Sequence, residues 1–342
     1  MRKLLLVSLL TCVAQLSAAD VAYSPVVGGI TVTLSGAVNG VPKLSTFTPA
    51  MRLPLAGSFV GRGRGTLTDV SATSFTDTSA GWSASALSQA ATPYFVRIRS
   101  GVAQGTWWQI STSTANTATV VTVLNRGITP SAAGIAAGDT YEIVPGDTLA
   151  TLFSGIATTI GGTSAAEADL IRVHDGVNWR EYYYNTSVSQ WREGTSTFNR
   201  NNIVVRPDTG VVYIRRGNGN VSFLQLGAVS DAKEQILIGS SGVTPIGSVF
   251  PVARTLGSLN IQASPGFNAF SGNLATADKV SLFDGVNWRT FHYNQSVAQW
   301  REGTSTFNRN TLSIPFGAPV IVERGSAATT PSFISLTPPY TL

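Results

Sequence analysis

The residues with the greatest capacity for chemistry lie in a 27-residue stretch that occurs twice. The stretch begins at Asp175 and again at Asp284, and the two copies agree at 22 of 27 positions. Each copy holds two tryptophans, each followed by arginine. This pattern suits a ligand platform, in which flat indole faces hold sugar rings while arginines bond the hydroxyls. The candidate binding residues are Trp179, Arg180, Trp191, Arg192, Trp288, Arg289, Trp300 and Arg301.

The same tryptophans also have a purely structural interpretation, which we favour. A Trp side chain buries ~150 to 250 Å², worth several kcal/mol at about 25 cal/mol per Å², and arginine commonly stacks on such rings. The pattern therefore predicts a repeated core unit first and a ligand platform second.

Carboxylate catalysis needs two carboxyl groups about 5 to 10 Å apart across a cleft. The two copies share only one Asp and one Glu, which are Asp175 and Glu193 in the first copy, and the Asp is expected in a turn. We assign no catalytic residue, and a secreted hydrolase is the least favoured function.

The two histidines occupy positions that are not duplicated. His174 aligns with Phe283, and His292 aligns with Tyr183. A lone His on a strand is usually a surface residue, and no Cys, second His or calcium-loop motif accompanies either one. We therefore expect both histidines at the surface, and neither a metal nor a cofactor.

Turns and strands must position these residues. Asp175-Gly176 and Asp284-Gly285 predict turns, because Gly accepts a positive φ, and a strand should follow each. Side chains alternate between the faces of a strand. One face keeps its aromatic character in both copies and is expected to be buried, whereas the other changes and is expected to be exposed. The first face holds Tyr182 and Tyr184 with Phe291 and Tyr293, and the second holds Glu181 and Tyr183 with Thr290 and His292.

The whole chain of 342 residues is 43% hydrophobic and 12% charged, and it is rich in Gly, Ser, Thr, Val and Asn. Many short strands joined by tight turns require this composition, which predicts an all-β fold built from several sandwich- or barrel-like modules with an internal tandem repeat. The repeat extends beyond the 27 residues, giving repeat module A at 146–228 and repeat module B at 252–342. A β-rich module at 54–145 precedes them. Residues 20–53 form an N-terminal strand and connector, and 229–251 form a connector with a strand at 234–238.

Strand signals in the β-rich module include Tyr94 to Arg99, which a glycine-bearing hairpin joins to the next strand. Alternation places Tyr94, Val96 and Ile98 on one face and Phe95 and Arg97 on the other. We expect the first face to form the core.

The N-terminus reads as a secretory signal peptide at residues 1–19. Arg2 and Lys3 precede an apolar run of 13 residues, and small residues lead to an expected cleavage after Ala19. The run is too short for a membrane-spanning helix, which needs about 20 residues, and we expect no transmembrane segment in the mature chain. The only cysteine, Cys12, lies in this leader, so the mature chain would have no thiol.

The expected partners follow from charge and compartment. Without the leader the chain holds 21 basic and 18 acidic side chains, and the arginines are dispersed, which does not favour nucleic acid as a partner. Surface polysaccharide or other envelope proteins are the expected partners. Self-association through an unpaired strand edge is a further expectation.

Five stretches carry a family resemblance: YFVRIRSGVAQ from Tyr94, GTWWQISTS from Gly105, YEIVPGDTLATLF from Tyr141, and the DGVNW and RPDTG elements between Asp175 and Gly210. In these stretches the chain resembles an uncharacterised family of secreted, paralogous β-rich proteins of verrucomicrobial-type bacteria. The resemblance implies an exported protein and carries no catalytic residues. We expect a non-enzymatic cell-surface, envelope or extracellular-matrix component with a structural or adhesion role. Carbohydrate binding and hydrolysis are the alternatives.

Overall fold

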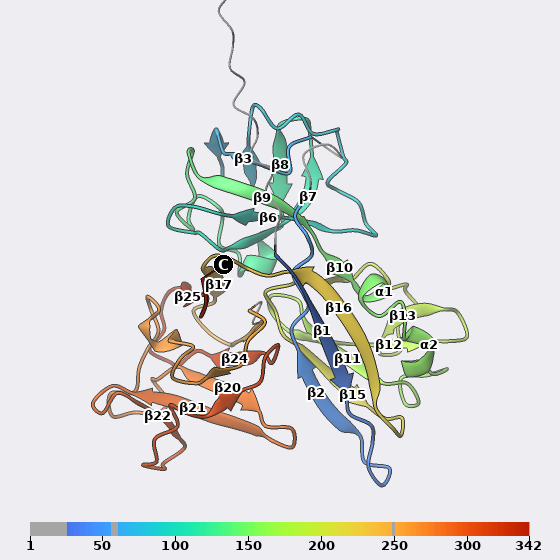
Figure 1. The fold of residues 1–342 in the computed structure, drawn as a ribbon, viewed down its shortest axis with the longest axis vertical. Helices are drawn as coiled ribbons and strands as arrows, with labels where there is room; N and C mark the ends of the chain where they lie inside the picture. The colour runs from blue at the N-terminus through green and yellow to red at the C-terminus, as the bar shows by residue number, and fades with distance from the viewer. Residues whose placement is uncertain (1–25, 56–60, 248–249, 342) are drawn as a thin grey trace, which may run out of the picture.

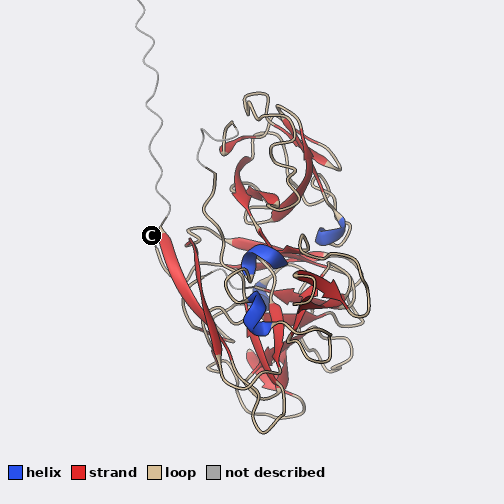
Figure 2. Ribbon diagram, turned by 90° about the vertical axis from the view of Figure 1, so that its right-hand side faces the viewer, coloured by secondary structure: helices blue, strands red, loops and turns tan. Residues whose placement is uncertain are grey.

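The computed structural model describes residues 26–55, 61–247 and 250–341. The predicted leader, with Cys12, lies outside these residues. Strands and loops make up almost all of the described chain, and the helices are single short turns (Figure 2). The predicted all-β fold is confirmed. Among the described residues no helix is long and apolar enough to cross a membrane.

The β-rich module is one antiparallel seven-stranded sheet in the order β3-β9-β6-β7-β8-β5-β4. Aromatic and β-branched side chains fill its core, among them Phe75, Trp108 and Tyr141. Its strands are β3 (Arg64–Thr66), β4 (Asp69–Val70), β5 (Ser74–Thr76), β6 (Tyr94–Ile98), β7 (Trp107–Ser113), β8 (Thr117–Val120) and β9 (Thr140–Pro145), and the 3-10 turn η1 (Val123–Asn125) follows β8.

Repeat module A forms a five-stranded sheet in the order β13-β12-β11-β15-β2, covered by a β1-β16 ribbon. Two of these strands, β1 (Val27–Leu34) and β2 (Lys43–Phe47), precede the β-rich module in the chain. The others are β10 (Asp147–Thr148), β11 (Leu170–His174), β12 (Trp179–Asn185), β13 (Gln190–Glu193), β14 (Val204–Val205), β15 (Val211–Arg215) and β16 (Val221–Ala228), with the short helices α1 (Leu149–Leu152) and α2 (Ala157–Ile160). Strands β10 and β14 form a separate small pair.

Repeat module B has a five-stranded sheet in the order β22-β21-β20-β24-β18 and a β17-β25 ribbon. This strand order matches that of module A, and the small pair β19-β23 matches β10-β14. The elements are β17 (Glu234–Ile238), β18 (Val243–Ile246), β19 (Arg254–Thr255), η2 (Ile261–Ala263), β20 (Lys279–Phe283), β21 (Trp288–Asn294), β22 (Gln299–Glu302), β23 (Ser313–Ile314), β24 (Val320–Glu323) and β25 (Ser332–Leu336). Strand pairing thus adds β1 and β2 to module A, and β17 and β18 to module B.

The three modules meet near the centre of the molecule, with the β-rich module above modules A and B in Figure 1. Strand β6 contributes to this meeting point with both of its faces. Val96 and Ile98 enter the core of the β-rich module as predicted, but Phe95 and Arg97 on the other face are also buried, at 0% and 1% exposed. Phe95 packs with Met51 and Ala228, which belong to the strands and connections of module A.

The predicted turns and buried face of the repeated stretch are largely as expected. Gly176 and Gly285 both have φ of 97°, and Tyr182 and Phe291 are in the module cores. The expectation of an exposed second face is wrong at Tyr183 and His292, which are 7% and 5% exposed. A second layer covers this face: Leu170 and Ala168 pack against Tyr183, and Phe270 packs against His292 with ring centroids 4.9 Å apart.

Candidate functional site

Trp191 and Trp300 are core residues and cannot offer an indole face to a ligand. They are 1% and 0% exposed. Trp191 lies on β13 with its ring centroid 5.5 Å from that of Phe153, and Trp300 lies on β22 with its ring 5.8 Å from Phe267. The ligand-platform prediction is therefore corrected at these two positions, where burial in the cores explains the retention of Trp.

Trp179 and Trp288 lie just after the Asp-Gly turns and keep part of their surface in solvent. Trp179 packs edge-on against His174, with centroids 5.3 Å apart. Trp288, which is 36% exposed, packs against Phe283 at 5.5 Å. Of the four tryptophans proposed as a platform, these two are positioned to contact a ligand.

The arginines that follow these two tryptophans are held by carboxylates on the neighbouring strand and, in module A, also in the preceding turn. In module B, Arg289 makes a bidentate pair with Glu302, with Nε–Oε1 2.8 Å and Nη2–Oε2 2.6 Å, and Arg309 approaches the same carboxylate at 3.4 Å. The hydrogen bond from Arg289 holds the pKa of Glu302 below its ordinary value.

In module A, Arg180 divides its contacts between Asp175, at 2.8 Å, and Glu193, at 3.6 Å. Burial raises the pKa of Asp175, but hydrogen bonds from Asn178, Arg180 and Val177 outweigh it and bring the pKa to about 2. Asp175 is thus an ionised turn residue in the working pH range, unsuited to act as a general acid.

Arg192 and Arg301 are half-buried on the second face of the hairpins. They lie directly across the strand pair from Tyr183 and His292, respectively. Nη1 of Arg192 and Nε of Arg301 are buried and find no hydrogen-bond partner among the described residues. The eight residues proposed as one platform are therefore divided between core, hairpin surface and strand-edge ion pairs.

A buried Asp–Arg pair that the motif search missed anchors each repeat module. In module B, Asp278 accepts from Arg324 Nη1 at 2.6 Å and from the Gly325 N–H at 2.8 Å. In module A, Asp169 takes the same place and bonds Arg215 and the Tyr213 hydroxyl. The sequence offers one signal for this pair, which is an Ala-Asp dipeptide directly before the two matching strands that begin at Leu170 and Lys279.

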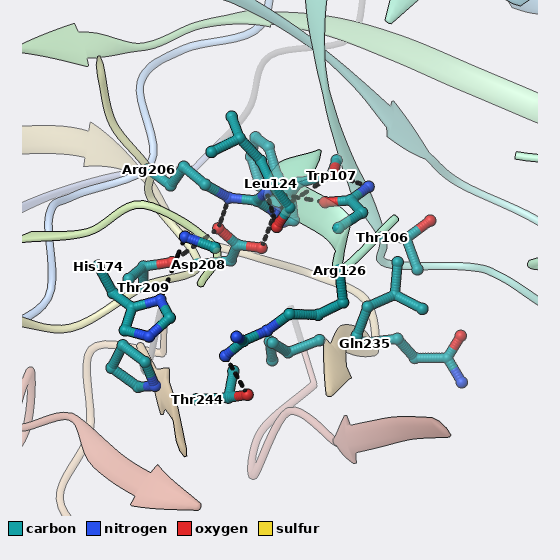
Figure 3. A pocket seen from close by; sticks show the side chains of 15 residues that line it. Thr106, Trp107, Leu124, Arg126, His174, Arg206, Asp208, Thr209, Gln235 and Thr244 are labelled. Carbon is teal, nitrogen blue, oxygen red and sulfur yellow. Dashed lines mark hydrogen bonds and ion pairs between the residues drawn. The ribbon is translucent and has the colours of Figure 1, made fainter. Parts of the chain in front are cut away.

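The three modules enclose a small polar cavity of about 20 Å³ at their junction (Figure 3), with room for about one water molecule. Its walls include Trp107, Asn125 and Arg126 from the β-rich module, His174, Arg206 and Asp208 from module A, and Gln235 and Thr244 from module B.

Arg206 and Asp208, both from the RPDTG element, form the centre of this junction. Arg206 pairs with Asp208 at 2.8 and 2.6 Å, and its Nη1 also donates to Oδ1 of Asn125 at 2.7 Å. Arg126 reaches across to Oγ1 of Thr244 at 2.6 Å. Hydrogen bonds at the junction thus join module A to the β-rich module through Arg206, and the β-rich module to module B through Arg126.

His174 faces this cavity and is buried, at 5% exposed. The expectation that both histidines are surface residues is therefore wrong. Its Nδ1 accepts from the Gly176 N–H at 3.2 Å, while Nε2 has no partner among the described residues. Burial and the charge of Arg126 lower the pKa of His174 to about 4, so the imidazole is neutral at pH 7.

A second buried network fixes module B to the β-rich module. Arg97 Nη1 bonds Glu142 at 2.6 Å, and the same guanidinium bonds Glu234 of β17. Glu234 also accepts from Nε1 of Trp107 at 2.8 Å. Burial raises the pKa of Glu234 above its ordinary value, although the charge of Arg97 and the hydrogen bonds to the carboxylate act to lower it.

No family model matches the chain, and no curated protein or solved structure shows significant similarity to it. Within the described ranges, no three His, Cys, Asp or Glu side chains are grouped as metal ligands would be.

Proposed function

We propose that this protein is an exported, non-enzymatic structural or adhesion component of the cell surface, envelope or extracellular matrix. The observation that carries the proposal is a set of exposed apolar side chains at matched positions of both repeat modules. The matched pairs are Val177 with Val286, Val188 with Val297, and Phe198 with Phe307. We call these six residues the apolar tips.

The apolar tips have nearly the same exposure in both modules. Phe198 and Phe307 are 72% and 73% exposed, and the guanidinium of Arg200 or Arg309 lies over each ring at 5.9 Å. Two exposed polar positions of the same stretch differ between the copies, at Thr186 and Ser189. An apolar side chain in water gains nothing for folding, so its retention in both copies supports contact with a partner.

The test compares the mature chain, residues 20–342, with the double variant Phe198→Ser, Phe307→Ser. We expect the variant to keep its far-ultraviolet circular dichroism and thermal midpoint, and to adsorb several-fold less to isolated cell-envelope material. The control is Thr186→Ala, Gln295→Ala, which changes exposed residues that differ between the copies. Equal adsorption of all three proteins would overturn the role of the tips, and recovery of the native protein in the cytoplasm with its leader intact would overturn export.

Carbohydrate binding is the second candidate, and the partly exposed indoles of Trp179 and Trp288 favour it. A glycan array probed with the mature chain tests it. Binding that is lost in a folded Trp179→Ala, Trp288→Ala variant, but kept when the two phenylalanines are replaced, would identify the indoles as the platform.

A further inference from the structure

A cleft of about 420 Å³ separates strands β1 and β2 of module A from module B. One wall consists of β1 residues 30–33, β2 residues 44–47 and the following Thr48, and the other consists mainly of residues 282–285 and 315–318 of module B. In Figure 1, β1 and β2 lie on the side of module A that is next to β20 and β24. The volume is within the range of about 300 to 1,000 Å³ found for ligand pockets.

The edge of β2 that faces the cleft carries unpaired main-chain groups. Strand β2 is the last strand of its sheet and pairs only with β15. The Thr48 N–H points away from β15, because it donates to the Gly317 carbonyl of module B at 2.8 Å. In an antiparallel pair, every second residue turns its N–H and C=O outward. The groups of Leu44 and Thr46 therefore face the cleft.

Strand β1 presents a second open edge to the same cleft. It pairs only with β16, and the Val229 N–H donates to the Val26 carbonyl at 2.8 Å, so residues of even number in β1 bond to β16. Residues of odd number, Gly29, Thr31 and Thr33, consequently direct their N–H and C=O groups away from β16. Free edges of this kind are templates for an additional strand.

In module B the β-rich module occupies part of the matching strand edges. The Gln235 N–H of β17 donates to the Gly105 carbonyl at 3.1 Å. Arg126 donates to the Val243 carbonyl of β18. Part of the β-rich module thus lies against module B at the place where module A has the open cleft.

The walls of the cleft favour an uncharged occupant. The side chain of Arg289 is bound by Glu302, and Oδ1 of Asp284 accepts the N–H groups of Val286 and Asn287 at 2.9 and 2.8 Å. The remaining lining is made of hydroxyl and apolar side chains from both modules. An acidic residue entering the cleft would lose its hydration without finding a free cation. A basic residue would find only the exposed carboxylate of Asp284, where water screens an ion pair and makes it weak.

We propose that this cleft binds an extended, uncharged polypeptide segment of a partner protein, which adds as a strand to the edge of β1 or β2. Main-chain hydrogen bonds would supply the affinity, and the apolar and hydroxyl walls would select the side chains. The site is separate from the apolar tips and does not depend on their role.

The test uses the mature chain and a displayed library of random heptapeptides, followed by affinity measurement with the best synthetic peptide. We expect selected sequences to be uncharged and rich in β-branched residues. Binding should protect the amides of Gly29, Thr31, Thr33, Leu44 and Thr46 from hydrogen exchange, or the subset on one of the two strands.

The chain offers a closely matched pair of variants. Thr33 and Ser222 are cross-strand partners joined by a hydroxyl hydrogen bond of 3.0 Å, and both direct their N–H away from the other strand. Thr33→Pro and Ser222→Pro each remove that bond and one outward N–H, but only Thr33 lines the cleft. We expect about tenfold weaker peptide binding for Thr33→Pro, which leaves a peptide carbonyl unpaired, and unchanged binding for Ser222→Pro.

Three outcomes would overturn the proposal. They are the absence of any selected peptide, equal effects of the two proline variants in folded proteins, and protection confined to amides outside β1 and β2. Oligosaccharide binding that Thr33→Pro abolishes while peptides fail to bind would reassign the cleft to a carbohydrate.

Discussion

The indole N–H of Trp107 donates to the carboxylate of Glu234 across 2.8 Å, although the two residues lie 127 positions apart in the chain. Both side chains are buried, at 1% and 2% exposed. A buried carboxylate requires such donors, because water cannot reach it. The bond therefore couples the packing of the β-rich module to the first strand of module B.

Replacing Trp107 with Phe should destabilise the protein by about 1 to 3 kcal/mol, because it removes a hydrogen bond to a buried charged group. Trp108→Phe is the matched control, since its neighbouring indole donates at 2.9 Å to the neutral hydroxyl of Thr106. We expect a smaller loss there, about 0.5 to 1.5 kcal/mol. Urea unfolding followed by tryptophan fluorescence measures both, and an equal loss would show that Glu234 does not depend on this donor.

Local pattern predicted the strands of the repeated stretch well. Alternation located the β12 and β21 hairpins, and the Asp-Gly turns have the expected positive φ at Gly176 and Gly285. These features depend on neighbouring residues alone, so they can be predicted from the sequence.

Burial of the second face was not predictable in this way. Tyr183 is covered by Leu170 and Ala168, and His292 by Phe270, and those contacts form only when the modules fold. Arg97 lies on the face of β6 that was not expected to form the core, yet it pairs with Glu142 and Glu234, which lie 45 and 137 residues away. Alternation identifies which side chains share a face, but it cannot show what packs on that face.

The two tryptophans of one hairpin should respond differently to truncation. Trp191→Ala removes a fully buried side chain and should cost about 3 to 5 kcal/mol. Trp179→Ala, at the partly exposed end of β12, should cost about 1 kcal/mol or less. Thermal unfolding by calorimetry distinguishes them, and a severe loss in Trp179→Ala would mean that this Trp is also a structural residue and would weaken the carbohydrate-platform proposal.

The buried Asp278–Arg324 pair should contribute far more to stability than the exposed Arg289–Glu302 pair of the same module. Asp278→Asn leaves the guanidinium of Arg324, 2% exposed, without its counter-charge and should cost about 3 to 5 kcal/mol. Glu302→Gln, where both side chains are more than a quarter exposed, should cost about 0.2 to 1 kcal/mol. Urea midpoints of the two variants check the ranking, which similar losses would contradict.

His174 should make the protein less stable as the pH falls. Its pKa is about 4 in the folded protein and 6.5 as the ordinary value, so the unfolded chain binds the proton more readily. The stability that the neutral imidazole supports is complete above pH 6.5 and is lost progressively as the pH falls from 6.5 to 4. Arg126 on the facing module opposes protonation, while the nearby Asp175 favours it weakly.

The repeat supplies the natural control for this titration, because Phe283 stands where module A has His174. We expect His174→Phe to remove part of the fall in unfolding free energy between pH 6.5 and 4, on the order of 3 kcal/mol given about 1.4 kcal/mol per pKa unit. The comparison must be the difference between wild type and variant at each pH, since other buried groups, such as Glu234 with its raised pKa, also make the stability depend on pH. Parallel curves for the two proteins would show that His174 is not held neutral at the junction, and that the contact between the modules tolerates a charged imidazole.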